Sequence, residues 1–370
     1  MLYYCQNDKV VIFISKARLA LCERGRRMMN HTVGILGYGL YLPETVMTAR
    51  EISEATNGYW SEEAVREKLG IVQKTIPGPG DGTQEMGVYA ARDALRRTGL
   101  DPKAIDVILC IGEEWKEYPL TTSATYIQGA IGAENAWGID VQNRCCTTCS
   151  AMKIAKDMLM ADEELHTIMI VGGYRNGDYV DYTDKDMSMM YNLAAGAGAL
   201  ILQKDLGRNL VLGSHIMGDG SMARDAGVQI GGIAEPFTPD NVAEGYKSLR
   251  LLDAKHMKER LNEVSVPNWY RCIDESLRKS GGLTRADIGY LGILHFKRSQ
   301  HVAMVAELGL TPEQTTYLED YGHIGQVDQI LQIALGLESG KIKDGTLVCL
   351  IAAGIGYVWA STCVRWGEAE

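Results

Sequence analysis

One pattern occurs twice in this sequence, and it constrains the fold more than any other feature. Residues 95–99 (LRRTG) lead through a short loop to the apolar run DVILCIG, and residues 277–281 (LRKSG) lead to the run YLGILHF. In both copies a helix, a short strand, a turn into another helix and a second buried strand then follow, the last being TIMIVGG or TLVCLIAAG. The repeat therefore predicts two similar α/β halves.

The repeat also predicts where reactive side chains meet. The turn into the later helix carries Cys145 in the first half and His323 in the second, and the preceding buried strand ends at residues 112–114 or at His295. If the halves pack about a pseudo-twofold axis, equivalent positions face each other near that axis. A cysteine, two histidines and a carboxylate then converge, and a cysteine beside a histidine is what nucleophilic catalysis needs.

The turn that carries Cys145 has a pattern of its own. Residues 138–156 (GIDVQNRCCTTCSAMKIAK) predict a short strand, a tight turn and a helix. A cysteine at a helix N-terminus is biased toward the thiolate, because unpaired N–H groups there favour an anion. Cys146 and Cys149 lie on the same turn, but the spacing CCxxC has no matching distant pair, so no metal site is predicted.

Composition narrows the class of protein. The 370 residues are enough for two domains, and a net charge of −10 argues against nucleic acid as the main partner. Nine scattered cysteines are typical of a reducing, cytoplasmic protein. No apolar run approaches the roughly 20 residues that cross a membrane, so no membrane partner is expected.

The predicted halves span residues 29–205 and 206–370. Residues 1–28 contain a short apolar run and a basic stretch, but the run is too short for a secretion signal and no small-residue cleavage site follows. We interpret them as an extension upstream of a natural start, outside the fold. Two local predictions are less regular: the helical pattern of residues 251–279 breaks near Pro267, and residues 316–318 form a short strand.

Several segments, in order, resemble the thiolase superfamily, most closely its β-ketoacyl-ACP synthase III and HMG-CoA synthase branch. The resemblance covers about residues 33–366 and implies a thiolase-like α/β fold, with two pseudo-symmetric βαβ halves in αβαβα layers. It also implies a homodimer. The matching segments are GILGYGLYLPETVMTAREI, LGI at residues 69–71, QEMGVYAARDAL, IDVQNRC at residues 139–145 and TLVCLIAAGIGYVWASTCVRW.

The resemblance implies a set of catalytic residues. Cys145 lies five residues after Asp140, which is the spacing of the family's nucleophile motif. His295 matches the family histidine at the end of the "VPH" strand, and His323 occupies the place of the family asparagine in "xGN". Glu114 lies where HMG-CoA synthases carry a catalytic glutamate, and the neighbouring Glu113 competes for that role.

The resemblance also implies binding residues. The glycine-rich turn of Gly354, Ile355 and Gly356 matches the loop that contacts the thioester. The backbone N–H groups of Cys145 and Ile355 are expected to form the oxyanion hole. Lys68, just before the LGI segment, is a candidate for a coenzyme A or carrier phosphate, although a solvated lysine is an equal interpretation.

The predicted activity is an acyl transfer that forms a carbon–carbon bond of the Claisen type through an acyl-cysteine intermediate. The acyl group arrives on coenzyme A or an acyl-carrier protein as substrate, and no resident cofactor is expected. In this mechanism His295 stabilises the Cys145 thiolate, both histidines hold the enolate oxygen, and Glu114 transfers a proton. Two alternatives stay open: an HMG-CoA-synthase-like or thiolase-like enzyme on coenzyme A esters, acting alone or with a small accessory subunit, and a noncatalytic scaffold of the same fold.

Overall fold

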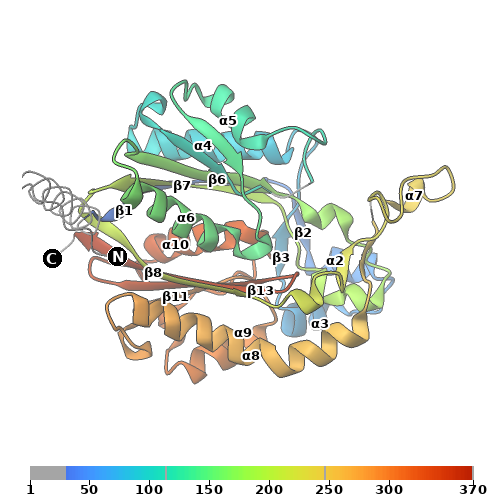
Figure 1. The fold of residues 1–370 in the computed structure, drawn as a ribbon. Helices are drawn as coiled ribbons and strands as arrows, with labels where there is room; N and C mark the ends of the chain where they lie inside the picture. Colours follow the sequence, from blue (N-terminus) through green and yellow to red (C-terminus); the bar gives the residue numbers. More distant parts are fainter. Residues whose placement is uncertain (1–30, 113–114, 246, 369–370) are drawn as a thin grey trace, which may run out of the picture.

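The computed structural model describes residues 31–112, 115–245 and 247–368. In this part of the chain, one sheet of nine strands has the order β11-β12-β13-β8-β1-β7-β6-β4-β5, and two further sheets have two strands each. The pair Gly34 and Leu210 joins β1 to β8, and Figure 1 shows the strands on either side of this junction as two stacked layers. The first layer contains β1 (Val33–Tyr41), β7 (Gly196–Lys204), β6 (Thr167–Tyr174), β4 (Val107–Cys110) and β5 (Trp137–Asp140), and the second contains β8 (Arg208–Gly218), β13 (Val358–Glu368), β12 (Leu347–Gly354) and β11 (Tyr290–Ile293).

Helices form the remaining three layers, which gives the predicted αβαβα arrangement (Figure 1). One pair of helices covers the first sheet layer, a second pair lies between the two sheet layers, and a third covers the second sheet layer. These pairs are α4 (Thr83–Thr98) with α5 (Ser123–Ile131), α6 (Thr147–Ala161) with α10 (Asp328–Glu338), and α8 (Ala254–Lys279) with α9 (Arg298–Glu307). In the described part of the chain, none of the helices is both long and apolar enough to cross a membrane.

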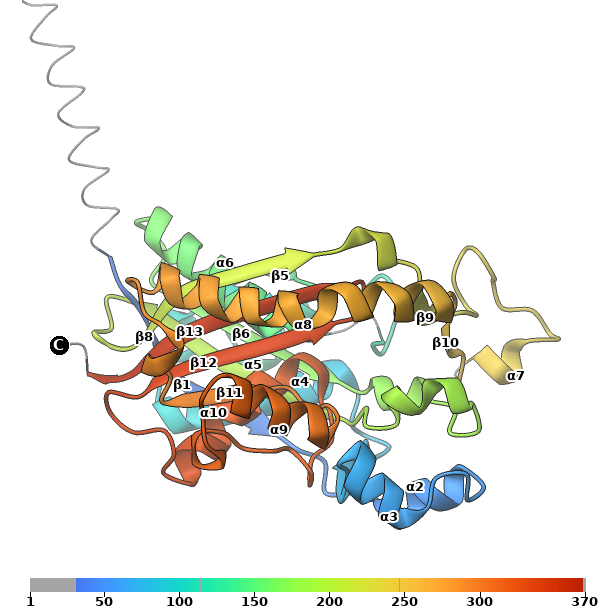
Figure 2. The ribbon, with the colours of Figure 1, turned by 90° about the horizontal axis from the view of Figure 1, so that it is seen from below.

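Smaller elements lie at one end of these layers, as Figure 2 shows from below. They are β2 (Val46–Thr48) paired with β3 (Gln73–Thr75), α2 (Ala49–Ala55), α3 (Glu62–Ala64), β9 (Ala226–Val228) paired with β10 (Leu249–Leu251), and α7 (Val242–Gly245).

The two sheet layers repeat each other strand by strand. β4 runs parallel to β6, which is antiparallel to β7, and β11, β12 and β13 have the same relation. Where β5 pairs with β4, the second half has a single parallel bridge between Leu291 and Thr315. The predicted internal repeat is therefore confirmed, and the predicted boundary between residues 205 and 206 lies in the connection from β7 to β8.

The central helices bring the two key turns together. α6 is preceded by a 3-10 turn, Arg144–Cys146, and α10 by another, Gly325–Val327, and these two turns contact each other. Met152 and Leu159 of α6 share one buried apolar cluster with Ile330 and Ile333 of α10. Burial of a side chain of this size is worth about 1.5–3 kcal/mol, so the cluster fixes the position of both helix N-termini.

Two local predictions are wrong. α8 continues through Pro267, whose missing N–H leaves a backbone carbonyl free on an exposed side of the helix, where water can reach it. The opposite side is anchored in the core through Trp269 and Ile273. Residues 316–318 do not form a strand. Side chains take up the carbonyls that a strand partner would bind: Gln332 donates to Thr316 and Lys341 donates to Thr315.

Candidate active site

Cys145 lies between β5 and α6, on a turn held by side chains. The Asp140 carboxylate at the end of β5 accepts hydrogen bonds from the backbone N–H groups of Ser123 and Ala124, which fixes β5 against the start of α5. Arg144, directly before the cysteine, has a φ of +52°, which is unusual for a residue with a side chain. Backbone strain of this kind is found at functional sites more often than elsewhere.

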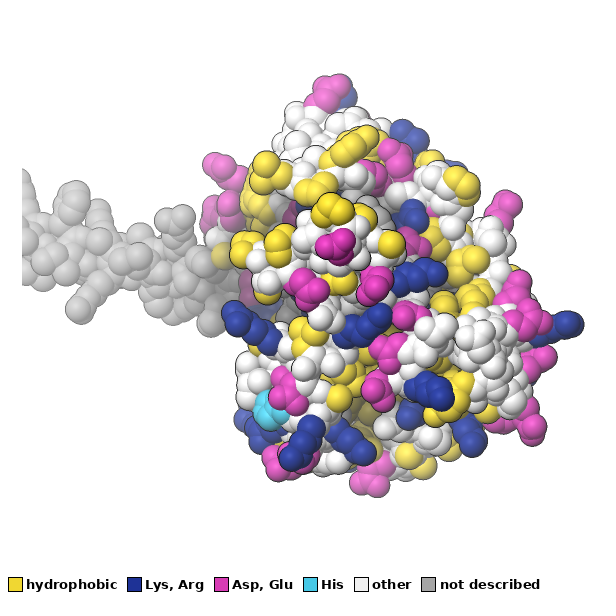
Figure 3. Space-filling view, turned by 90° about the vertical axis from the view of Figure 1, so that its right-hand side faces the viewer, with side chains coloured by type: hydrophobic (Ala, Val, Ile, Leu, Met, Phe, Trp, Pro, Cys, Tyr) yellow, Lys and Arg dark blue, Asp and Glu magenta, His cyan; other side chains and the backbone are white. Residues whose placement is uncertain are grey.

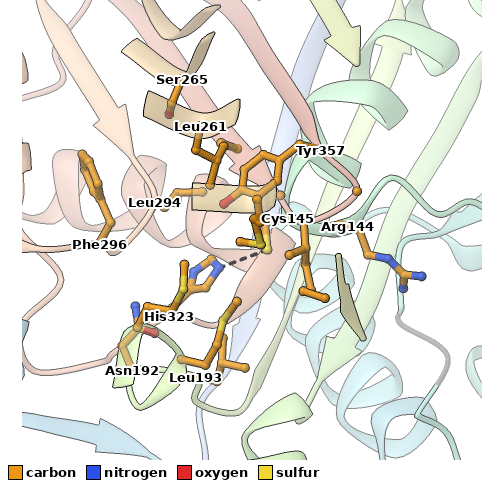
Figure 4. Close-up of a pocket in the computed structure, with 18 of the residues that line it drawn as sticks. Arg144, Cys145, Asn192, Leu193, Leu261, Ser265, Leu294, Phe296, His323 and Tyr357 are labelled. Carbon is orange, nitrogen blue, oxygen red and sulfur yellow. Dashed lines mark hydrogen bonds between the residues drawn. The ribbon is translucent and has the colours of Figure 1, made fainter. Parts of the chain in front are cut away.

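The Cys145 sulfur contacts His323. Its Sγ atom lies 3.1 Å from His323 Nε2 (Figure 4). On the other side of the ring, Nδ1 lies 2.6 Å from Asp328 Oδ2. Asp328 is completely buried and also accepts hydrogen bonds from the backbone N–H groups of His295 and Ile324. The result is a chain of cysteine, histidine and aspartate, which orients and charges the ring as a nucleophile requires.

The pKa of His323 is raised well above its usual value. Burial alone would lower this pKa, because a charged ring is costly away from water, but the Cys145 sulfur and the Asp328 carboxylate favour the imidazolium more strongly. An imidazolium in contact with a cysteine favours the thiolate form of that cysteine. The two turns that the repeat predicts to face each other therefore bring the Cys145 sulfur into contact with a histidine that favours its charged form.

His295 lines the same cavity but has other partners. The carbonyl oxygen of Gly70 can only accept a hydrogen bond, so His295 Nε2 donates to it at 3.1 Å. The Asn192 side-chain amide donates to His295 Nδ1 at 2.9 Å. Burial lowers the pKa of His295 to about 4, so the ring is neutral. The sequence-based mechanism predicts that His295 stabilises the Cys145 thiolate. In the structure the histidine in contact with Cys145 is His323, because both ring nitrogens of His295 bind other groups.

Two residues of the site were missed from the sequence. Asp328 had a signal: it is the single charged side chain of the predicted helix at residues 326–337, and a buried carboxylate needs partners. Asn192 had none. Its segment passes beside the second turn, where the Asn192 carbonyl accepts the His323 N–H and the Ala194 N–H donates back to His323. Sequence spacing does not reveal such a crossing.

The glycine-rich turn packs on the backbone of the nucleophile. A Cβ atom added to Gly354 would lie 2.8 Å from Arg144 Cβ and 2.9 Å from the Cys145 nitrogen. Only glycine fits at this close approach. Gly354, Ile355 and Gly356 all line the cavity. They are the residues for which the family resemblance implies contact with the thioester.

Replacing Gly354 by alanine is expected to slow acylation of the enzyme on the order of 100-fold, because a shift of the Cys145 backbone misplaces the reacting sulfur. Stopped-flow release of coenzyme A from an acyl-CoA measures this step. Gly80→Ala is the matched control, since a Cβ there meets nothing within 4 Å. Equal rates for the two variants would show that the approach of Gly354 to Cys145 is unimportant.

A cavity of about 1100 Å³ opens over Cys145 and His323. This exceeds the roughly 300–1000 Å³ of most small-molecule sites. Figure 4 shows Leu261, Leu294 and Phe296 around it, and its wall is formed mainly by α8, by the loop before α9, by β9 and β10 and by residues 186–193. An apolar group fits such a wall better than a polar one does.

Two predicted site residues are not part of this cavity as described. Lys68 is exposed and does not line it, whereas Lys258 and Lys297 do. Glu114 and its neighbour Glu113 lie outside the described residues, and so do residues 1–28. Figure 3 shows one face of the molecule, on which Lys and Arg side chains are interspersed with Asp and Glu.

Comparisons with known proteins point to one family. The family model for 3-oxoacyl-[acyl-carrier-protein] synthase III matches residues 139–220, and the model for the C-terminal part of the same enzymes matches residues 277–366. A β-ketoacyl-[acyl-carrier-protein] synthase III of Symbiobacterium thermophilum is 26% identical over 346 residues, which are 92% of this chain and 100% of that protein. The matched ranges contain Cys145, His295, His323 and Asp328.

Solved structures show the same fold. The β-ketoacyl-[acyl-carrier-protein] synthase III of Thermus thermophilus superposes with a TM-score of 0.78 at 22% identity, over 91% of this chain and 100% of that one. A variant of OleA from Xanthomonas campestris, solved with bound lauric acid and lauroyl-CoA, superposes with a TM-score of 0.75 at 16% identity, over 90% of this chain and 99% of that one.

Proposed function

The chain belongs to the thiolase superfamily, in the branch of the 3-oxoacyl-[acyl-carrier-protein] synthases III, and from this premise we propose how its site performs the condensing acyl transfer of that branch. The proposal is a two-step reaction in which Cys145 first takes an acyl group from one thioester and a second thioester then forms a carbon–carbon bond with it. The contact of Cys145 with the His323–Asp328 pair is the observation that carries the proposal.

In the first step the Cys145 thiolate attacks the carbonyl carbon of an acyl-CoA or acyl-carrier thioester. The developing oxyanion lies against the backbone N–H groups of Cys145 and Ile355, and one donor of this kind contributes on the order of 3 kcal/mol. His323 gives its Nε2 proton to the departing thiol. The thioester is the substrate, and the proposal needs no resident cofactor.

In the second step a carbanion at the α-carbon of another thioester attacks the acyl group on Cys145. The carbon–sulfur bond breaks, and the sulfur returns to its position beside His323. Gly356 leaves open space at the cavity next to the cysteine for the thioester, and the apolar wall of the cavity accepts an acyl chain. The OleA variant with a similar fold was solved with bound lauroyl-CoA, and this supports an acyl chain as the ligand of the cavity.

Product analysis tests the proposed reaction. Purified protein is incubated with a fatty acyl-CoA and either malonyl-CoA or a second acyl-CoA, and 3-oxoacyl products are measured by liquid chromatography and mass spectrometry. The proposal expects a product that is longer than either acyl group. Free fatty acid alone, or no turnover with either partner, would contradict it. The noncatalytic scaffold is disfavoured, because the pair of Cys145 and His323 is intact.

We also propose that the chain forms a homodimer through β5. This strand ends the order of the large sheet among the described residues, so one of its edges has no strand partner there. Trp137 is 49% exposed and Ile139 is 42% exposed on it. An exposed apolar edge strand is a template for pairing with another chain.

The seven free cysteines of the described residues support a reducing compartment such as the cytoplasm.

Replacing Ile139 by lysine is expected to shift the protein from dimer to monomer in sedimentation velocity, because an unpaired charge is then placed in the interface. Val302→Lys on α9 is the matched control, since Val302 is 60% exposed on another element. A monomer at all concentrations for the unchanged protein, or a dimer that Ile139→Lys leaves intact, would refute pairing through β5.

A further inference from the structure

The partner of His323 Nδ1 decides which nitrogen holds the proton when the ring is neutral. A carboxylate accepts hydrogen bonds and has none to give, so Asp328 keeps a proton on Nδ1. After the first step, in which His323 gives up its other proton, Nε2 carries a lone pair. That lone pair points to the side of the ring where Cys145 lies, 3.1 Å away. Next to the acyl group on Cys145, the neutral ring of His323 can therefore accept a proton at Nε2 but cannot donate one from this nitrogen.

Among the described residues, which do not include Glu113 and Glu114, none around Cys145 offers a second base. His295 is neutral, its Nδ1 is occupied by Asn192 and its Nε2 donates to Gly70. Burial raises the pKa of Tyr357 to about 12, so its hydroxyl keeps its proton and remains a donor. Its ring lies beside Cys145 in Figure 4. Asp186, the carboxylate among the described lining residues, is exposed to water.

The two known ways of making a thioester carbanion need different groups. Loss of carbon dioxide leaves the electron pair behind, so it needs hydrogen-bond donors for the enolate oxygen and no base. Removal of an α-proton needs a base within reach of the carbon. A pair of histidines serves the first route only if both present N–H groups to the substrate. Here one ring is engaged by Gly70 and Asn192, and the other presents a lone pair.

We propose that His323, oriented by Asp328, removes the α-proton of the second substrate, which is therefore an acyl thioester with no carboxyl group to lose. This inference rests on the proposed condensation and adds the class of its second substrate. The structure assigns His323 as a general base in the second step and as the proton donor in the first.

The protons balance without a further reactant. Nε2 takes the α-proton, and the electron pair of that carbon–hydrogen bond forms the bond to the acyl carbon on Cys145. Collapse of the tetrahedral intermediate breaks the carbon–sulfur bond and releases a 3-oxoacyl thioester. The sulfur leaves as a thiolate beside the protonated His323, which restores the starting pair.

Deuterium at the α-carbon tests the inference. The full-length protein is acylated on Cys145 with unlabelled octanoyl-CoA and then mixed with octanoyl-CoA that carries deuterium at the α-carbon. The 3-oxoacyl product and the recovered octanoyl-CoA are analysed by mass spectrometry. We expect a product that has lost one deuterium, a slower single turnover than with unlabelled substrate, and no requirement for malonyl-CoA.

The variant His323→Asn separates the base from the fold. It leaves an amide at this position, and we expect release of deuterium to fall by at least about 100-fold, which is typical for removal of a general base. His215→Asn is the matched control, because His215 lies on β8, outside the cavity lining, and contacts Lys279. Thermal unfolding of both variants shows whether either loses its fold.

The outcomes distinguish this inference from the proposed function. If Cys145 is acylated and malonyl-CoA yields carbon dioxide and product while α-deuterium is retained, the inference is overturned and the proposed condensation stands. If His323→Asn releases deuterium as fast as the unchanged protein, another residue is the base and the inference is also overturned. If Cys145 takes no acyl group, the proposed function itself fails.

Discussion

Replacing Cys145 by alanine is expected to abolish acyl transfer, with a loss of turnover on the order of 10⁶-fold, as is typical when a nucleophile that works with a histidine is removed. The sulfur is the atom that contacts His323 Nε2 and opens onto the cavity. The variant should fold normally, since Cys145 is only half-buried. Steady-state formation of 3-oxoacyl product from acyl-CoA measures the effect.

Cys149→Ala is the matched control for this experiment. Cys149 is one turn along α6 and completely buried, and burial raises the pKa of its thiol to about 12, so it is protonated and out of reach. We expect this variant to keep its turnover and to lose some stability, because removal of a buried sulfur leaves a small void. If Cys145→Ala retains turnover, or if Cys149→Ala loses as much, Cys145 is not the nucleophile.

Replacing Asp328 by asparagine is expected to lower turnover on the order of 10⁴-fold, as loss of the orienting carboxylate does in other triads. An asparagine keeps the volume of Asp328 but has one oxygen to accept hydrogen bonds. In the unchanged protein, the buried Asp328 carboxylate accepts hydrogen bonds from the ring of His323 and from two backbone N–H groups. The ring would lose the partner that fixes its tautomer.

The same variant should change the pH dependence of thiol alkylation. In the unchanged protein the pKa of His323 is raised, so the imidazolium persists through neutral pH and is lost only as the pH rises through that raised value. The rate of Cys145 alkylation by iodoacetamide should therefore vary little between about pH 6 and 8. In Asp328→Asn the imidazolium loses a carboxylate, and the rate should fall as the pH falls across this range.

Asp106→Asn is the matched control, because Asp106 is a half-buried residue whose carboxylate also binds backbone N–H groups. Asp106 accepts hydrogen bonds from the N–H groups of His166 and Thr167, away from the cavity. We expect a loss of stability in this variant with unchanged turnover and an unchanged alkylation profile. An Asp328→Asn protein that behaves like Asp106→Asn in all three measurements would show that Asp328 is only structural.

The internal repeat made the fold predictable, and with it the meeting of Cys145 and His323. The repeated LR[RK][TS]G segments fix where each buried strand begins, so equivalent turns follow at equivalent places in the two halves. Because α6 and α10 pack side by side in the middle layer, those turns touch. Symmetry between the two halves predicts backbone positions, and this prediction is correct because the sheets repeat strand by strand.

Side-chain orientation was beyond that argument. The repeat placed His295 near the site, yet the direction of its ring depends on Gly70 and Asn192, which come from distant segments. The continuity of α8 through Pro267 likewise depends on packing along the whole helix. Asp328 was visible as the single charged residue of its predicted helix, but its role required knowing that the backbone N–H groups of Ile324 and His295 and the ring of His323 all point toward it.

The central claim is that Cys145 carries the acyl group, and intact-protein mass spectrometry followed by peptide mapping tests it most directly. After a brief incubation with octanoyl-CoA, we expect one adduct with the mass of a single octanoyl group, located on Cys145 in the peptide that also contains Cys146 and Cys149. Fragmentation within that peptide distinguishes the three. An adduct on any other residue, or the absence of an adduct while 3-oxoacyl product accumulates, would contradict the account.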